Sequence, residues 1–250
     1  NNIIVVGVIN RVRVLQEAAI KNAWNGPPQC EHCGIRHLVL FSALREEDFS
    51  LIHEPIEEIT FKRGQRIYHA GDDPEYLYTV REGVVKLEHS MADGSERIVR
   101  ILMRGSVAGL EALVGQSYKQ DAVVIDPVLT CRIPIRTIHH LNRDLPHFHR
   151  QLLSRWQEAL TAADAWLTEL GTGTARMRIA RLLLHFSEQQ SPGEAFFVPT
   201  REDMAAMVST STETASRITA EFYRKGLLEN VTRNYVRVNA KALMQIASGG

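Results

Sequence analysis

Residues 200–226 read TREDMAAMVSTSTETASRITAEFYRKG and contain two short helical patterns separated by a polar turn. In the first pattern, Met204, Met207 and Val208 fall at i, i+3 and i+4, which gives a short helix a single buried stripe. Thr200 is the expected N-cap of that helix, because an acidic residue follows three positions later. The run Ser-Thr-Ser-Thr that follows Val208 supplies a turn and a second N-cap. The stretch therefore predicts a helix-turn-helix.

The second helical pattern follows that turn and ends before a glycine. At about 100° per residue, one side of this helix is polar near its N-terminal end and the opposite side is apolar. The polar side chains are Glu213, Ser216 and Arg217, and the apolar ones are Ala215, Ile218 and Phe222. Arginine can donate two parallel hydrogen bonds to guanine, glutamate can accept from cytosine, and a serine hydroxyl can reach a base edge or a phosphate. We therefore predict that the polar side reads base edges in the major groove of double-stranded DNA.

Further residues around this helix are suited to the DNA backbone. Three hydroxyl side chains lie immediately before it: Thr210, Ser211 and Thr212. Hydroxyls and backbone N–H groups at a helix start can hold a phosphate. Residues 228–231 and 235–238 predict a hairpin with Arg233 at its tip, like the wing of a winged helix. An ordinary small helical subdomain, with a solvated Glu–Arg pair at i, i+4, is the alternative for this segment alone.

A long helix is predicted over residues 145–170, before the helix-turn-helix. Its apolar side chains are spaced by four, three, four, three and four residues: Leu152, Trp156, Ala159, Ala163, Trp166 and Leu170. This a/d seam, flanked by polar residues, predicts a dimerisation helix that pairs with its copy across a two-fold axis. The alternative is a helix packed on its own domain. The Gly-Thr-Gly run at 171–173 is the expected hinge after it.

Residues 56–135 carry short β-rich runs broken by glycine turns, which predicts an antiparallel sandwich or barrel. The expected fold class is α+β. We divide the chain into an N-terminal extension (1–44), a β-barrel domain (45–142), the dimerisation helix (143–171) and a winged helix-turn-helix (172–250).

Composition limits the classes of function. The 250 residues carry 29 Lys/Arg and 29 Asp/Glu, but residues 171–250 hold ten basic against seven acidic side chains, a mild excess compatible with phosphate contacts. No apolar run approaches the roughly 18 residues that cross a bilayer, so no membrane partner is expected. Three cysteines indicate a reducing, cytoplasmic location. No nucleophile–base constellation, P-loop or dinucleotide fingerprint is present, so we do not expect an enzyme.

The chain resembles the CRP/FNR superfamily of bacterial transcription regulators over about residues 30–248. The matching stretches are FKRGQ (61–65), YHAGD (68–72), VREGVVK (80–86), the long helix and TETASR (212–217), which contains the family's Glu-x-x-Ser-Arg recognition motif. The resemblance implies a cyclic-nucleotide-binding-like β-barrel (a double-stranded β-helix or jelly roll). It also implies a homodimer that binds a TTGAT-type palindrome and contacts RNA polymerase.

The effector implied by the resemblance differs between branches of the family. The cyclic-nucleotide branch has a Gly-Glu pair and an Arg-Ser or Arg-Thr pair at its phosphate site. Aligned through Gly109 and Ala122, this sequence has Gln120 and Asp121 in place of the Arg-Ser pair. A carboxylate would repel a cyclic phosphate and offers no planar fork of donors. We therefore do not expect cyclic AMP as the effector.

The oxygen-sensing branch holds an iron–sulfur cluster through three N-terminal cysteines and one cysteine of the β domain. This sequence matches it at Cys30, Cys33 and Cys131, but has Val39 at the remaining position. A nitrogen ligand can replace one thiolate, and His37 is better placed for this than the other histidine of the loop. A zinc site of Cys3His type would use the same atoms. A thiol–disulfide switch between the first two cysteines, and no sensor at all, are the other possibilities.

Three functions stay open on the sequence alone. The leading hypothesis is a dimeric DNA-binding regulator that responds to oxygen or redox state. A constitutive or small-ligand-responsive regulator without a metal cluster is the alternative. A module that binds a ligand or a protein, and not DNA, is the more distant one.

Overall fold

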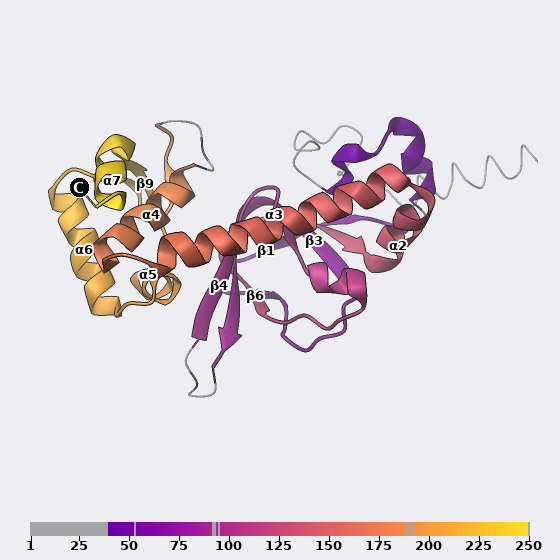
Figure 1. Ribbon diagram of the computed structural model, residues 1–250, viewed down its shortest axis with the longest axis horizontal. Coiled ribbons are helices and arrows are strands. Elements are labelled where there is room, and N and C mark those ends of the chain that lie inside the picture. The colour runs from indigo at the N-terminus through magenta and orange to yellow at the C-terminus, as the bar shows by residue number, and fades with distance from the viewer. Residues whose placement is uncertain are drawn as a thin grey trace, which may run out of the picture. The chain divides into compact units, whose positions relative to one another are not determined.

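The computed structural model describes residues 40–52, 54–91, 94, 96–188, 190 and 193–249 (Figure 1). The expected metal ligands Cys30, Cys33 and His37 lie outside these residues. The described chain forms two compact units. The first contains residues 40–84 and Leu102–Gln157, and the second contains Val85–Ile101 and residues 158–249.

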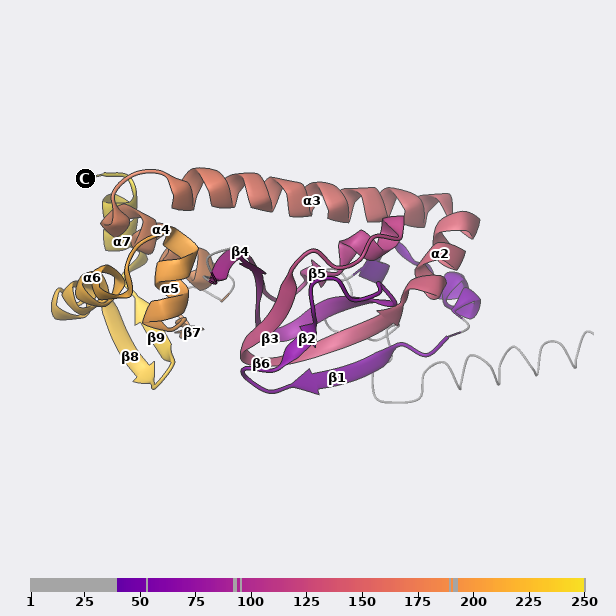
Figure 2. The same cartoon turned by 90° about the horizontal axis from the view of Figure 1, so that it is seen from below.

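An antiparallel β-sheet is the centre of the first unit, as the glycine-punctuated runs predict, and its hairpin at Val85–Ile101 belongs to the second unit. Its strands are β1 (Glu57–Phe61), β2 (Arg66–Tyr68), β3 (Tyr76–Ser90), β4 (Glu96–Leu102), β5 (Val107–Ala108) and β6 (Asp121–Pro134). The strand order is β1-β6-β3-β4, with β2 paired to β6 and β5 paired to β3. Figure 2 shows β1, β2, β3 and β6 side by side. Leu77, Val124 and Ile133 are completely or almost completely buried, so strand residues of β3 and β6 supply part of the core.

Short helices flank the sheet in the first unit. They are η3 (Leu40–Ala43), η4 (Glu46–Leu51), η5 (Leu110–Val114) and α2 (Ile135–Asp144). Phe49 and Ile138 on these helices are fully buried, together with Phe148 at the start of the next helix. Burying three large apolar side chains stabilises the unit by roughly 1.5–3 kcal/mol each.

One glycine marks a close approach of two strands. Gly83, in the middle of β3, has a φ of +82°, in the left-handed region that favours glycine. A Cβ atom at this position would lie 2.1 Å from the backbone oxygen of Pro127 in β6. The two backbones are therefore in contact at a point where no side chain fits.

The long helix α3 (Pro146–Gly171) confirms the predicted helix within one residue at each end. A turn at residues 172–174, at the expected hinge, separates it from α4 (Ala175–Ser187). Thr174 is the N-cap of α4, and its side chain accepts a hydrogen bond from the N–H of Met177.

The second unit contains the helix-turn-helix and the wing. Its remaining elements are β7 (Phe196–Phe197), α5 (Arg201–Val208), α6 (Thr212–Arg224), β8 (Leu228–Thr232), β9 (Tyr235–Val238) and α7 (Ala240–Ala247). The three strands pair in the order β7-β9-β8. Ile179, Met204, Phe222 and Leu243 are fully buried and form part of one core under α4, α5, α6 and α7.

Candidate nucleic-acid interface

Helix α5 begins where the sequence predicts. The Thr200 hydroxyl accepts a hydrogen bond from the N–H of Asp203 at 3.1 Å, and donates one to the Asp203 carboxylate at 2.8 Å. Met204, Met207 and Val208 are buried, which confirms the predicted stripe. Ser209 ends the helix with a φ of 53°, in the left-handed region. A serine in this conformation is uncommon, so the surrounding contacts must hold the turn in place.

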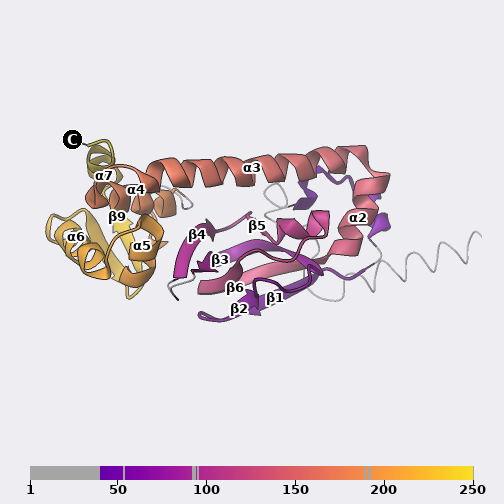
Figure 3. The same ribbon diagram turned by 60° about the horizontal axis from the view of Figure 1, so that its bottom comes forward.

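Helix α6 presents the predicted polar side to solvent. Ser211 is its N-cap and accepts a hydrogen bond from the N–H of Thr214 at 3.2 Å. The buried side chains of α6 are Ala215, Ile218, Thr219 and Phe222, and the exposed ones include Glu213, Ser216 and Arg217. The three residues predicted to read bases therefore share an open surface at the N-terminal end of α6, which lies next to α5 (Figure 3).

The hydroxyl residues before α6 divide into two roles. Ser211 uses its hydroxyl for the cap, while Thr210 and Thr212 have partly or fully exposed side chains. Ser211 already binds the N–H of Thr214, so the N–H groups of Thr212 and Glu213 are the ones in the first turn that can face an anion. The β8–β9 hairpin places Arg233, which is exposed, in the turn between Thr232 and Tyr235. Along the chain, the hydroxyl side chains thus come before the residues predicted to read bases, and Arg233 comes after them.

Glu221 of α6 pairs with two basic residues, one at the end of the same helix and one on α4. Lys225 Nζ lies 2.7 Å from Glu221 Oε1, and Arg176 Nε of α4 lies 3.3 Å from the same oxygen. The hydrogen bond from Lys225 is the main cause that lowers the pKa of Glu221. The Arg176 guanidinium also lies over the Phe222 ring, 5.8 Å from its centre. Sequence reasoning missed Arg176, because only the Glu221–Lys225 spacing of i, i+4 is visible locally.

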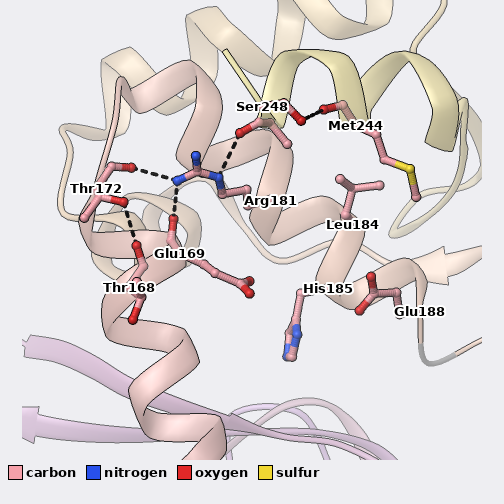
Figure 4. Close-up of a pocket in the computed structure, with 10 residues that line it drawn as sticks. Thr168, Glu169, Thr172, Arg181, Leu184, His185, Glu188, Met244 and Ser248 are labelled. Atoms are coloured by element: carbon pink, nitrogen blue, oxygen red, sulfur yellow. Dashed lines mark hydrogen bonds between the residues drawn. The ribbon is translucent and has the colours of Figure 1, made fainter. Parts of the chain in front are cut away.

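An arginine of α4, Arg181, binds the end of α3 and the turn after it (Figure 4). Arg181 donates hydrogen bonds to the backbone oxygens of Glu169 and Thr172, both at 2.9 Å. Its Nε donates to the backbone oxygen of Ala247, at the end of α7, at 3.0 Å. A cation is favourable beside the carbonyls of a helix C-terminus. Arg181 therefore ties the end of α3 to the end of α7.

A groove of about 460 Å³ lies beside this arginine, between the end of α3, α4 and α7. Its lining includes His185 of α4, whose ring packs edge-on against Trp166 with ring centres 6.0 Å apart. Burial lowers the pKa of His185, and the carboxylates of Glu188 and Glu169 oppose that shift.

The residues of the predicted dimerisation seam differ in exposure. Leu152 and Leu170 are buried within the chain, and Ala159, Ala163 and Trp166 are partly buried. Trp156 is 40% exposed. A second set of apolar side chains on α3 is more open to solvent: Leu153 (56%), Leu160 (51%) and Leu167 (72%). Together with Trp156, these follow spacings of three, four and seven, which is also a heptad pattern.

In the segment aligned with a cyclic-nucleotide phosphate site, the side chains are already bound to other residues of the chain. Asp121 accepts a hydrogen bond from the N–H of Ala70 at 2.7 Å and pairs with Arg66 at 3.1 Å. The Tyr118 ring stacks on Tyr68 with centres 3.9 Å apart. A Cβ atom at Gly109 would lie 2.8 Å from the Tyr118 ring, so the ring covers that glycine.

Tyr118 is also anchored through its hydroxyl group. The hydroxyl donates to the backbone oxygen of Tyr76 at 2.7 Å, and burial raises the pKa of Tyr118 to about 12. The phenol therefore stays neutral and remains a donor over the physiological pH range.

Cys131 is the one expected metal ligand that lies among the described residues. It is in β6, opposite Glu58 of β1, and 7% of its surface is exposed. Within the described ranges, no group of three or more His, Cys, Asp or Glu side chains is placed to hold a metal ion.

None of the helices in the described part of the chain is both long and apolar enough to span a membrane.

Two protein-family models match the chain. The cyclic nucleotide-binding domain matches residues 58–143, and the Crp-like helix-turn-helix domain matches residues 177–246. The fumarate and nitrate reduction regulatory proteins of Vibrio cholerae and Escherichia coli are each 25% identical to the chain over 225 residues. Each alignment covers 87% of this chain and 90% of the relative.

Solved structures share the fold. FixK2 from Bradyrhizobium japonicum matches with a TM-score of 0.70 at 23% identity. A CRP-family transcriptional regulator from Thermus thermophilus matches with a TM-score of 0.66 at 25% identity. Each match covers 76% of this chain and 96% of the solved one. The similarity thus extends over most of the chain, beyond the helix-turn-helix.

Proposed function

Because the chain belongs to the CRP/FNR family of transcription regulators and is not an enzyme, we propose that it binds a TTGAT-type palindrome as a homodimer. The exposed side of α6 is the observation that carries this proposal. Glu213, Ser216 and Arg217 occupy the three positions of the Glu-x-x-Ser-Arg motif and are all open to solvent. These side chains can pair with cytosine, a base edge or phosphate, and guanine, respectively.

The backbone contacts belong to the same proposal. Thr210, Ser211, Thr212 and Arg233 hold phosphates on either side of the bases, and the N–H groups at the start of α6 assist them. Each phosphate neutralised by a cation releases counterions, so binding must weaken steeply as salt rises.

A titration by fluorescence anisotropy tests the function. The wild-type protein is mixed with a duplex that carries two TTGAT half-sites, and with the same duplex after both half-sites are scrambled. We expect specific binding to be tighter by a factor of roughly 10³ or more at physiological salt. Equal affinity for the two duplexes would show that the protein is not a sequence-specific regulator of this type.

The partner across the two-fold axis is a second copy of the chain, through α3. The predicted seam contains Leu152, Trp156, Ala159, Ala163, Trp166 and Leu170. The burial of Leu152 and Leu170 within one chain favours an interface centred on Leu153, Trp156, Leu160 and Leu167. We further propose RNA polymerase as a partner and the cytoplasm as the location, where DNA and polymerase are present.

The proposed signal is oxygen or redox state. The likeness to fumarate and nitrate reduction regulatory proteins and the position of Cys131 support it. Cys131 is shielded in β6, as befits a structural thiolate ligand, and Cys30, Cys33 and His37 would complete a set of three thiolates and one imidazole. An iron–sulfur cluster bound there would supply an oxygen-sensitive group. The three thiolates would hold that group. His37 would supply the fourth ligand, in place of the cysteine that Val39 replaces.

Anaerobic purification decides between the sensor hypotheses. We expect iron and acid-labile sulfide in the protein, and DNA affinity that falls after exposure to air. A colourless, iron-free protein with the same DNA affinity before and after air would overturn the cluster. If Cys30→Ser then changed the response of the iron-free protein to an added oxidant, a thiol–disulfide switch would replace the cluster as the proposed sensor.

Cyclic AMP is not part of the proposal. The Asp121 carboxylate occupies the aligned phosphate position and already pairs with Arg66, and Tyr118 covers Gly109. Isothermal titration with cyclic AMP is expected to give no heat of binding. A measurable affinity would favour the alternative of a regulator that responds to a small ligand.

A further inference from the structure

A largely buried ion cluster joins the β3–β4 hairpin to the first helix of the helix-turn-helix, within the second compact unit. Lys86 Nζ of β3 lies 2.8 Å from Glu88 Oε2 and 2.9 Å from Asp203 Oδ1 of α5. Only 14% of the Lys86 side chain and 3% of the Glu88 side chain are exposed. Asp203 is as shielded as Lys86, at 14%. Charges removed from water to this extent interact more strongly than an exposed pair.

Asp203 has two partners, one for each carboxylate oxygen. Oδ1 binds Lys86, and Oδ2 accepts from the Thr200 hydroxyl that caps α5. Asp203 therefore both joins α5 to the hairpin and helps to cap the start of α5. Burial opposes the charge on Lys86, but hydrogen bonds to Glu88 and Asp203 outweigh it and raise the pKa of Lys86, so Lys86 keeps its charge.

A second polar contact lies at the turn between α5 and α6. The guanidinium of Arg97, in β4, donates to the Ser209 hydroxyl at 2.7 Å. Ser209 is the residue with the left-handed backbone, and its carbonyl oxygen accepts from Arg178 of α4 at 3.5 Å. Arg178 also donates to the backbone oxygen of Gly173 at 2.9 Å, in the turn after α3. The turn before the recognition helix is thus held by the hairpin and by α4.

The two hairpin contacts leave the reading side of α6 open. Lys86 and Arg97 reach α5 and the turn, whereas Glu213, Ser216 and Arg217 remain exposed. A hollow of about 350 Å³ is lined by Arg97 and Ser209 together with further hairpin and α5 residues. The contact between the hairpin and α5 is therefore not fully packed around Arg97 and Ser209.

We propose that Lys86 and Arg97 are positioning residues for DNA recognition: they hold α5 and the following turn on the hairpin, so that α6 is presented in a fixed orientation. Releasing these bonds frees the helix-turn-helix to move against the hairpin, and binding DNA must then restrict that motion again. The result is a weaker specific complex without the loss of any DNA contact. This inference rests on the proposed function in DNA binding.

Substitutions of the ion cluster test the proposal in the full-length protein. Lys86→Met keeps the length of the side chain and removes its charge, and Lys86→Arg keeps the charge. We expect Lys86→Met and Asp203→Asn each to weaken binding to the TTGAT duplex by about tenfold, and the double variant to be no weaker than either single one. Lys86→Arg is expected to stay within about threefold of the wild type.

The salt dependence distinguishes positioning from a direct phosphate contact. If Lys86 or Arg97 touched a phosphate, its removal would lower the slope of log K against log salt by about one. We expect the slope to stay unchanged in Lys86→Met and Arg97→Gln, while hydrogen exchange at residues 203–209 becomes faster. Arg136→Gln, which removes a pair with Glu54 at 3.2 Å in the first unit, is the matched control and should leave affinity unchanged.

The outcomes separate failure of the inference from failure of the function. If the wild type does not discriminate the TTGAT duplex, the proposed function fails. If the wild type binds and Arg217→Ala does not, while Lys86→Met binds normally or more tightly, only the positioning role is overturned. If Lys86→Met is weak but its salt slope falls by about one, Lys86 is a DNA contact and not a positioning residue.

Discussion

Arg217 and Arg233 are both exposed arginines of the second unit, yet we assign them different contacts with DNA. Arg217 is on the first part of α6, where a side chain can reach the major groove, and Arg233 is at the tip of the wing. Helical periodicity is enough to predict the exposed side of α6, because burial of Ala215, Ile218 and Phe222 determines how the helix is rotated.

Truncation of the two arginines should impair DNA binding in different ways. We expect Arg217→Ala to lose about 1–3 kcal/mol of binding energy and to accept other bases at one position of each half-site. Arg233→Ala should weaken binding to all sequences alike and lower the salt slope by about one. Anisotropy titrations on a set of single-base variants, at several salt concentrations, measure both effects. Equal losses on every sequence for Arg217→Ala would contradict its role in base reading.

His185 predicts how stability changes with pH. Its pKa in the folded protein lies below the usual 6.5 because of burial, so the unfolded chain takes up the proton first as the pH falls. The stability that this residue contributes is present above the unfolded pKa and is lost as the pH falls toward the folded pKa. We expect the wild-type Tm to fall more than that of His185→Gln between about pH 7.5 and about pH 5.5. His139→Gln, at an exposed site, should follow the wild type.

At the scale of elements, the local signals were sufficient for α5, α6 and the β8–β9 hairpin. Each has an N-cap, a buried stripe or a turn signal that acts within a few residues. Helix α7 was not predicted, since only Leu243 and Ile246 are buried in its eight residues and this pattern is too short to recognise. The contact between Lys86 and Asp203 could not be predicted either, because the two residues are 117 positions apart.

Arg181 is one of two arginines of α4 that bind backbone oxygens at the junction between α3 and α4. Arg181 donates three hydrogen bonds to carbonyl oxygens at the ends of two helices. Replacing it by alanine leaves those oxygens without a charged donor, so we expect Arg181→Ala to lower the free energy of unfolding by about 2–3 kcal/mol. Urea denaturation followed by circular dichroism measures this change. Lys241→Ala, at an exposed site on α7, is the control, and an equal effect of both would contradict the assignment.

At the scale of the whole molecule, the long helix has two heptad patterns one residue apart. The sequence alone could not decide between them, because Trp156, Ala163 and Leu170 fit both patterns. Burial within a single chain distinguishes them: Leu152 of the first pattern is covered, and Leu153, Leu160 and Leu167 of the second remain open. The residues before 40 are the other part that sequence reasoning could interpret only by resemblance, and the structure does not describe them.

Leu153, Trp156, Leu160 and Leu167 form a stripe of exposed apolar side chains on α3. This stripe predicts which substitution would disrupt the proposed dimer. Leu160→Glu places a charge in the middle of the stripe, so we expect it to shift the protein from dimer to monomer and to weaken palindrome binding by about 100-fold or more. Sedimentation equilibrium gives the oligomeric state. Val114→Glu, at an apolar side chain with 58% exposure in the first unit, should remain dimeric. A monomeric wild type, or a dimeric Leu160→Glu protein with normal DNA affinity, would overturn the interface.

The close approach at Gly83 limits how this protein can vary in evolution or in a mutant library. Gly64 has nearly the same backbone angle, but no atom lies within 4 Å of where its Cβ would be. Asparagine or aspartate, which tolerate that angle, should therefore survive selection at position 64. At position 83 every substitution would collide with the backbone of β6, because the obstacle at Pro127 is not a side chain that can rotate away. A saturation library selected for DNA binding should return glycine alone at that position.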